Sequence, residues 1–187
     1  MKKLSLIVII LVLVSSVTAA QVKTVHFKKL QEFLPSKEIK NFKRLKPSGT
    51  SQTTMGMSTS EAKVRYEEIR KDTLLAEGQE PVPIKTIDIK IGDMVAVPYL
   101  AMAFQMMGDS ESESEESSQK TVMVKSKYKG QEEIYKGQNG SCKIGFAVAN
   151  RYVITLEALY MNDVKVLYDL IDTIDLDNLE KLTTETK

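Results

Sequence analysis

Alternation of apolar and polar side chains is the feature that most restricts how this sequence folds. In residues 84–91 isoleucines alternate with polar residues, and residues 61–67 repeat the pattern with alanine, valine and tyrosine. Because successive side chains of a strand point to opposite faces, both segments are predicted to be strands, the first segment more clearly. Further strands are predicted at 121–128, 132–136, 141–149 and 151–158. Glycine and asparagine punctuate this last series, so consecutive strands are expected to be antiparallel neighbours.

Helical spacing of apolar residues occurs near both ends of the sequence. Residues 25–34 carry it before Pro35, and residues 162–174 carry it after a predicted cap at Asn162, with a short continuation to 182. Residues 94–107 are apolar nearly all round and are predicted to form a buried helix. The expected fold class is α+β, an antiparallel β-sheet flanked by helices.

The N-terminus has the three parts of a secretory signal peptide. Lys2 and Lys3 precede eleven residues, 4–14, that are apolar except for one serine, and small residues follow as far as Ala20. A membrane-spanning helix needs about 20 apolar residues, so we expect residues 1–20 to be cleaved near Ala20 rather than retained as an anchor. The protein is therefore predicted to be exported, to the periplasm or the medium, with no stable membrane insertion.

Residues 21–187 have the length of one domain. The whole chain carries 26 basic and 25 acidic residues. Loss of Lys2 and Lys3 leaves a mature net charge of −1, which gives no general attraction for nucleic acid. Residues 21–50 are nevertheless basic and residues 157–187 acidic. These are interpreted as solvated faces that attract each other, with a basic patch for an anionic envelope partner as the alternative.

Few residues suggest chemistry. His26 is the only histidine, so an imidazole-based hydrolytic site is not predicted, and a surface role on the first helix is expected. Cys142 is the only cysteine and shares a predicted strand face with Ile144, Phe146 and Val148. It is expected to be a buried core thiol, the alternative being a reactive or dimer-forming cysteine. No glycine pattern for phosphate or dinucleotide binding occurs.

Residues 109–119, DSESESEESSQ, contain no apolar side chain, so a disordered acidic loop is predicted. A weak Ca²⁺ site at its carboxylates is the alternative. Residues 55–57 and the pair Met106 and Met107 offer thioether sulfur, which suits Cu(I), although we expect these methionines to fill gaps in the core. No catalytic, cofactor-binding or metal-binding residue is therefore assigned.

The segment GFAVANRYVITLEA, followed by a helix and then IDLDNLEKL, resembles a pattern of small exported bacterial proteins, many uncharacterised, with a PsbP-like α/β/α sandwich. The resemblance covers residues 25–182 in the order of elements. It implies a helix-flanked antiparallel sheet in a binding or accessory protein, and it assigns no functional residue.

The expected function is that of an exported, non-enzymatic accessory or binding protein of the cell envelope, with an envelope protein as its partner. Two alternatives stay open from the sequence. One is a small exported hydrolase built on carboxylates, although the chain has no tryptophan to form a sugar-binding platform. The other is a metal-handling protein that uses methionines.

Overall fold

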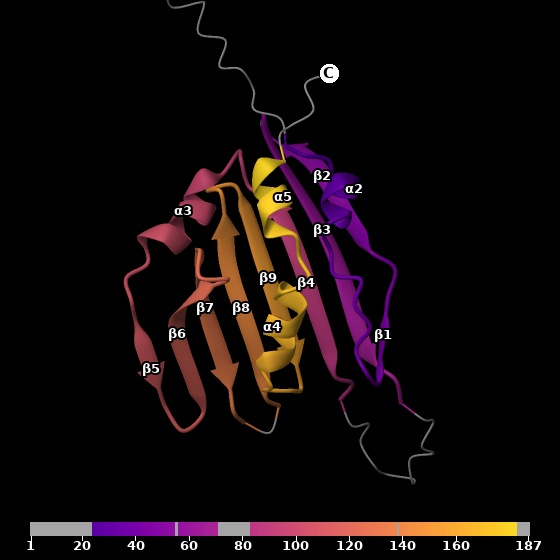
Figure 1. Cartoon of the computed structure of the whole chain (residues 1–187), viewed down its shortest axis with the longest axis vertical. Coiled ribbons are helices and arrows are strands. Elements are labelled where there is room, and N and C mark those ends of the chain that lie inside the picture. The colour runs from indigo at the N-terminus through magenta and orange to yellow at the C-terminus, as the bar shows by residue number, and fades with distance from the viewer. Residues whose placement is uncertain (1–23, 55, 71–82, 138, 183–187) are drawn as a thin grey trace, which may run out of the picture.

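One antiparallel β-sheet dominates the structure, a computed structural model that describes residues 24–54, 56–70, 83–137 and 139–182. Nine strands of the described residues pair in the order β1-β3-β4-β9-β8-β7-β6-β5, and β2 also pairs with β3 (Figure 1). The strands are β1 (Phe42–Arg44), β2 (Ser48–Thr54), β3 (Met57–Glu68), β4 (Thr86–Asp93), β5 (Glu111–Glu113), β6 (Ser117–Val124), β7 (Tyr128–Tyr135), β8 (Ser141–Val148) and β9 (Tyr152–Leu159).

The helices among the described residues are short. They are α2 (Phe27–Gln31), α3 (Pro98–Met106), α4 (Lys165–Ile171) and α5 (Leu176–Lys181). Helices α2, α4 and α5 lie on one side of the sheet, which we call the core face (Figure 1). The opposite side is called the open face. No helix among the described residues is both long and apolar enough to cross a bilayer.

Strand alternation defines which side chains reach the core face. Along β9 every second residue is buried, and the same is true of Ile87, Ile89 and Ile91 in β4, which are all fully buried. In register, Ile89 lies between Val64 of β3 and Leu156 of β9. These rows pack against leucines of the three short helices, among them Leu30, so burial of apolar area holds the two layers together.

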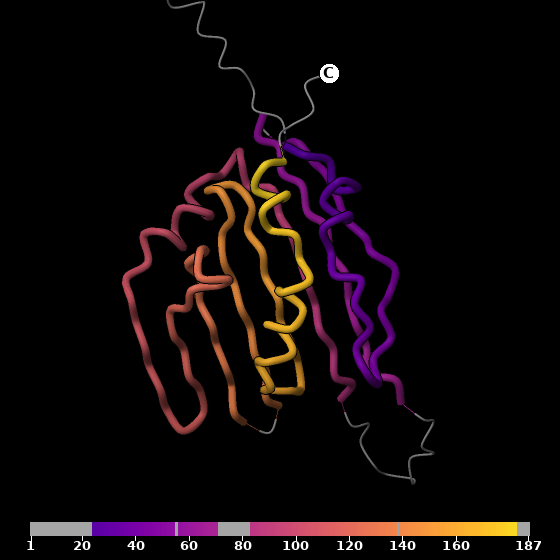
Figure 2. The backbone as a smooth tube through the Cα atoms, in the orientation of Figure 1, coloured from indigo at the N-terminus to yellow at the C-terminus, as the bar shows by residue number. Residues whose placement is uncertain are grey.

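The path of the chain explains the strand order. After β4 the chain crosses through α3 to the far edge of the sheet and begins β5 there (Figure 2). It then returns strand by strand until β9 pairs with β4. The predicted antiparallel neighbours from 121 to 158 are confirmed by this meander.

The expected α+β class is wrong, because the fold is dominated by its sheet. The predicted helix at 25–34 is reduced to five residues, and α4 has seven. Strand β3 is twelve residues long and extends beyond the strand predicted at 61–67, and β1 and β2 lie in and just after the basic segment at 21–50. Serine and threonine hydroxyls, such as those of Ser51 and Ser60 at 2.6 Å, let these polar strands pair across the hairpin.

The acidic segment at 109–119 forms a hairpin where the sequence predicts a disordered loop. Its first part is β5, which pairs with β6 in the register Glu111 to Lys120 and Glu113 to Ser118. Lys136 Nζ lies 2.6 Å from Glu113 Oε1, and this hydrogen bond and charge lower the pKa of the Glu113 carboxyl. Backbone pairing and lysines on neighbouring strands therefore order a segment that has no apolar residue.

The signal peptide predicted at 1–20 lies outside the described residues, as does Met55 of the segment 55–57. The described domain begins at Thr24, and α2 follows shortly afterwards.

Candidate functional site

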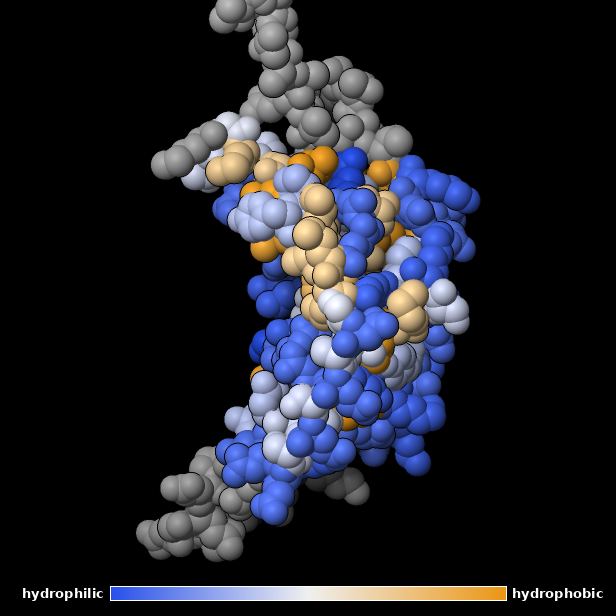
Figure 3. All heavy atoms as spheres, turned by 90° about the vertical axis from the view of Figure 1, so that its left-hand side faces the viewer, coloured by the Kyte–Doolittle hydropathy of each residue, from blue (hydrophilic) through white to orange (hydrophobic). Residues whose placement is uncertain are grey.

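Helix α3 carries large apolar side chains on its solvent-facing surface. Exposed fractions are 66% for Tyr99, 43% for Leu100, 44% for Met102 and 80% for Met106, and these four residues are called the α3 surface. The helix contains no charged residue, and its polar groups are the Gln105 amide and the Tyr99 hydroxyl. Figure 3 shows apolar side chains gathered on this side of the molecule, beside hydrophilic strands.

The helix lies on the open face of the sheet. Gly145 of β8 pairs with Thr155 on this face, and a Cβ atom at Gly145 would lie 3.2 Å from Cζ of Phe104. The ring of Phe104 therefore occupies the space that a side chain at Gly145 would fill. Ala101 is the one fully buried residue of the helix. Small residues in the sheet and in the helix thus let α3 approach closely, while its other sides stay in solvent.

A buried ion pair holds the chain where it enters α3. Asp93 is completely buried at the end of β4, and its carboxylate accepts hydrogen bonds from Arg151 Nη2 at 2.7 Å and Nε at 2.9 Å. The amide of Val25 donates to the same carboxylate at 2.7 Å, and that of Val95 at 3.2 Å. Burial lowers the pKa of Arg151, but hydrogen bonds and charge from Asp93 outweigh it, so the net pKa is raised.

The other end of the helix is held by a threonine of β6. Thr121 Oγ1 donates to the carbonyl of Gly108 at 3.0 Å and accepts from the amide of Ser110 at 3.2 Å. Lys129 Nζ also lies 3.0 Å from the carboxylate of Asp109. Contacts at both ends therefore hold this apolar helix in a fixed position on the surface of the folded protein.

An exposed apolar helix of this kind is suited to binding another apolar surface. Removal of apolar area from water is worth roughly 25 cal/mol per Å². Soluble monomers seldom expose contiguous apolar patches beyond a few hundred Å², and larger patches mark interaction sites. The α3 surface offers one phenol, one aliphatic side chain and two thioethers, a set suited to recognition of another apolar surface.

The two single residues of interest lie where the sequence predicts. His26 is exposed at the N-terminus of α2, where its Nδ1 accepts a hydrogen bond from the Lys28 amide at 3.3 Å. Cys142 is completely buried in β8, and burial, with smaller contributions from Asp163 and Glu132, raises its thiol pKa to about 12. The prediction of a buried core thiol is confirmed.

The methionines differ from expectation. Met57 is 49% exposed and Met106 is exposed on α3, so the prediction that they fill the core is wrong for both. The prediction that residues 94–107 form a buried helix is also wrong, since most of α3 is exposed. The core face is covered by α2, α4 and α5 instead. Among the described residues, no three histidine, cysteine or acidic side chains lie close enough to hold a metal ion.

A buried carboxylate relevant to the hydrolase alternative is Glu132 on β7. It accepts a hydrogen bond from the Tyr168 hydroxyl at 2.7 Å and pairs with Lys120 Nζ at 3.1 Å. Burial, followed by this hydrogen bond and charge, raises the pKa of Tyr168. Both oxygens of the carboxylate are thus occupied within the protein, and the group ties α4 to the sheet.

Sequence reasoning missed the α3 surface and the Asp93–Arg151 pair. Residues 94–108 carry no charge, which predicts burial, because composition does not indicate which face of the sheet the other helices leave uncovered. The ion pair joins residues 58 positions apart, which no local pattern indicates.

Comparisons with protein-family models, curated proteins and solved structures find no match to this chain. The resemblance to PsbP-like sandwiches therefore stays a prediction.

Proposed function

We propose that the chain is an exported, non-enzymatic accessory protein of the cell envelope that binds a partner protein through the α3 surface. The observation that carries this proposal is the exposure of Tyr99, Leu100, Met102 and Met106 on a helix that is anchored at both ends. The export signal predicted at 1–20 supports the location.

The surroundings of the helix favour a protein over an anionic bilayer. Asp109 follows α3, and the β5–β6 hairpin beside it carries Glu111, Glu113, Glu115 and Glu116. Lys129 pairs with Asp109 and Lys136 with Glu113, and the remaining carboxylates, those of Glu111, Glu115 and Glu116, repel an anionic lipid surface and attract basic side chains. The fitting partner presents an apolar groove whose rim carries lysine or arginine.

Site-specific photo-crosslinking tests the proposal. A photoreactive amino acid replaces Met106 in the full chain, and matched proteins carry it at Asp172, which is exposed beside α4 on the core face. We expect Met106 to yield a discrete adduct in the envelope fraction and Asp172 to yield none. The adduct should disappear when Leu100→Ser and Met102→Ser are added. Equal adducts from both positions, or none from Met106, would contradict the proposal.

The N-terminal residue of the protein recovered from cells tests the location. Mass spectrometry of envelope and medium fractions is expected to find a chain that begins near Gln21. Recovery of a chain that still begins at Met1 from the cytoplasm would overturn export while leaving the α3 surface untouched.

A further inference from the structure

A second feature of the open face is a pair of lysines that lie directly opposite each other. Lys63 of β3 is the register partner of Lys90 of β4. Side chains that are opposed in this way have Cβ atoms about 4.5–5.5 Å apart, and like charges at such positions destabilise a sheet. Both side chains are exposed, and neither forms an ion pair with another described residue. The fold therefore keeps two uncompensated positive charges side by side.

The neighbouring carboxylates form no ion pair with these lysines in the described part of the structure, and this includes Glu61, two residues before Lys63 on the same face. Asp88, two residues before Lys90, is bound by Arg65 Nε at 2.7 Å and Nη2 at 2.8 Å. This hydrogen bond and charge raise the pKa of Arg65, although burial opposes them. Glu157 lies opposite Asp88, diagonally from Lys90, and forms no ion pair with either lysine.

A groove runs beside the two lysines. Between β1 and β2, residues 45–47 stand opposite two residues of β3, because Arg44 pairs with Tyr66 and Ser48 with Lys63, and the amide of Leu45 still donates to the Arg65 carbonyl at 2.8 Å. The resulting space of about 350 Å³ is lined by Leu45, Lys46, Ser48, Lys63, Val64, Arg65, Glu67, Asp88 and Lys90. Four of these side chains are basic and two are acidic.

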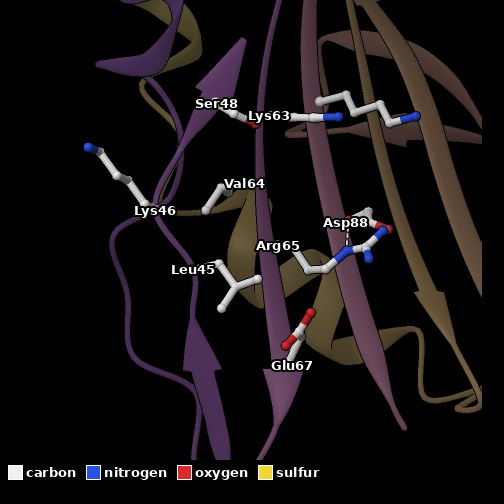
Figure 4. A pocket seen from close by; sticks show the side chains of 9 residues that line it. Leu45, Lys46, Ser48, Lys63, Val64, Arg65, Glu67 and Asp88 are labelled. Carbon is white, nitrogen blue, oxygen red and sulfur yellow. Dashed lines mark hydrogen bonds and ion pairs between the residues drawn. The ribbon is translucent and has the colours of Figure 1, made fainter. Parts of the chain in front are cut away.

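Figure 4 shows how the labelled side chains of the groove lie. The Arg65 guanidinium meets Asp88, and Lys46 points away from Lys63 on the other side of β3. The paired lysines on β3 and β4, rather than Lys46, therefore form the charged centre of this region.

We propose that Lys63 and Lys90 form a binding site for a phosphate group. A phosphate with two negative charges neutralises both ammonium groups, whereas one carboxylate neutralises only one of them. Lysine binds phosphate as a point charge, and charge-assisted hydrogen bonds are the stronger ones. The site is separate from the α3 surface and stands independently of the partner proposed there.

Nuclear magnetic resonance titration of the mature chain with inorganic phosphate tests the site. Acetate at equal ionic strength serves as the monovalent comparison. Phosphate should shift the amide signals of β3 and β4 around Lys63 and Lys90 in a saturable manner, and acetate should not. Equal shifts with both anions would overturn the proposal.

The decisive variant is Lys90→Glu. It replaces a repulsive pair with an attractive one, so the denaturation midpoint should stay equal or rise while phosphate affinity falls at least about tenfold. Lys143→Gln is the matched control, because Lys143 lies on the same face opposite Glu157, and it should leave affinity within about twofold. Unchanged affinity in Lys90→Glu would overturn the site, and misfolding is excluded by the retained midpoint.

Two sources of the phosphate group are distinguished by separate arms of the experiment. Glycerol 3-phosphate represents a soluble phosphomonoester, and vesicles of phosphatidic acid in phosphatidylcholine represent a lipid headgroup that is also a phosphomonoester. Binding of the ester but not the vesicles assigns a soluble ligand, and binding of both, lost in Lys90→Glu, assigns a lipid headgroup. Binding of neither phosphate ester nor inorganic phosphate would contradict the site.

Discussion

Asp93 and Arg151 form a buried ion pair in which two guanidinium nitrogens meet the two carboxylate oxygens at 2.9 and 2.7 Å. The pair joins the end of β4 to the start of β9, and the same carboxylate binds the amide of Val25. One side chain thus connects the beginning of the described domain, the centre of the sheet and the entrance to α3.

Arg151→Met is predicted to destabilise the protein strongly. It leaves the fully buried Asp93 carboxylate without its counter-charge, which costs about 3–5 kcal/mol. Arg65→Met is the control, because the Arg65–Asp88 pair is partly exposed and such pairs contribute below about 1 kcal/mol. Urea unfolding measures both free energies. Equal losses in the two variants would show that the buried pair has no special role.

Gly145→Leu is predicted to displace α3 while the core face stays intact. A Cβ atom added at Gly145 would lie 3.2 Å from the Phe104 ring, and a larger side chain needs the space that the ring fills. We expect faster amide hydrogen exchange in α3 and little change in β4. Phe104→Ala should partly relieve Gly145→Leu in the double variant. Additive effects of the two substitutions would contradict this contact.

Thr121→Val is predicted to loosen the acidic hairpin selectively. The substitution removes the hydroxyl that binds Gly108 and Ser110 but keeps the shape of the side chain. Limited proteolysis between α3 and β5 should become faster, with a global loss of at most about 1–2 kcal/mol. Thr155→Val on the same open face is the control, and it should leave proteolysis unchanged.

Alkaline pH is predicted to destabilise the fold. Burial raises the pKa of Cys142 from 9.0 to about 12 and that of Tyr152 from 10.0 to about 12. The folded protein holds these protons more tightly than the unfolded chain does. The stability that the two groups contribute is therefore complete below their unfolded pKa values of 9.0 and 10.0, and it is lost as the pH rises towards their folded pKa of about 12. Unfolding free energies at pH 8 and 10.5 measure the slope. Cys142→Ala should reduce this slope, and an unchanged slope in that variant would contradict the prediction.

Alternation is sufficient to predict the central strands, because Ile87, Ile89 and Ile91 all face the core while the polar residues between them face the other side of the sheet. The edge strands were harder, since the serine-rich β2 and the acidic β5 owe their structure to backbone partners rather than to their own apolar residues.

The placement of α3 could not be predicted from its composition. Its apolar residues fit burial equally well, and exposure follows only because three other helices occupy the core face. The pairing of Lys63 with Lys90 was likewise hidden, because register depends on how β3 and β4 align rather than on either segment alone.

The late return of β9 to β4 has a kinetic consequence. Strands β5 to β8 lie between them in the sequence, so the central ladder of the sheet joins Asp93 to an arginine 58 positions later. The chain loses the entropy of closing this long segment before most of the stabilising contacts have formed. The protein is therefore expected to fold slowly, as other topologies of high contact order do. Until β9 pairs with β4, each half of the sheet has an edge strand with unpaired backbone N–H and C=O groups, which can pair with another chain.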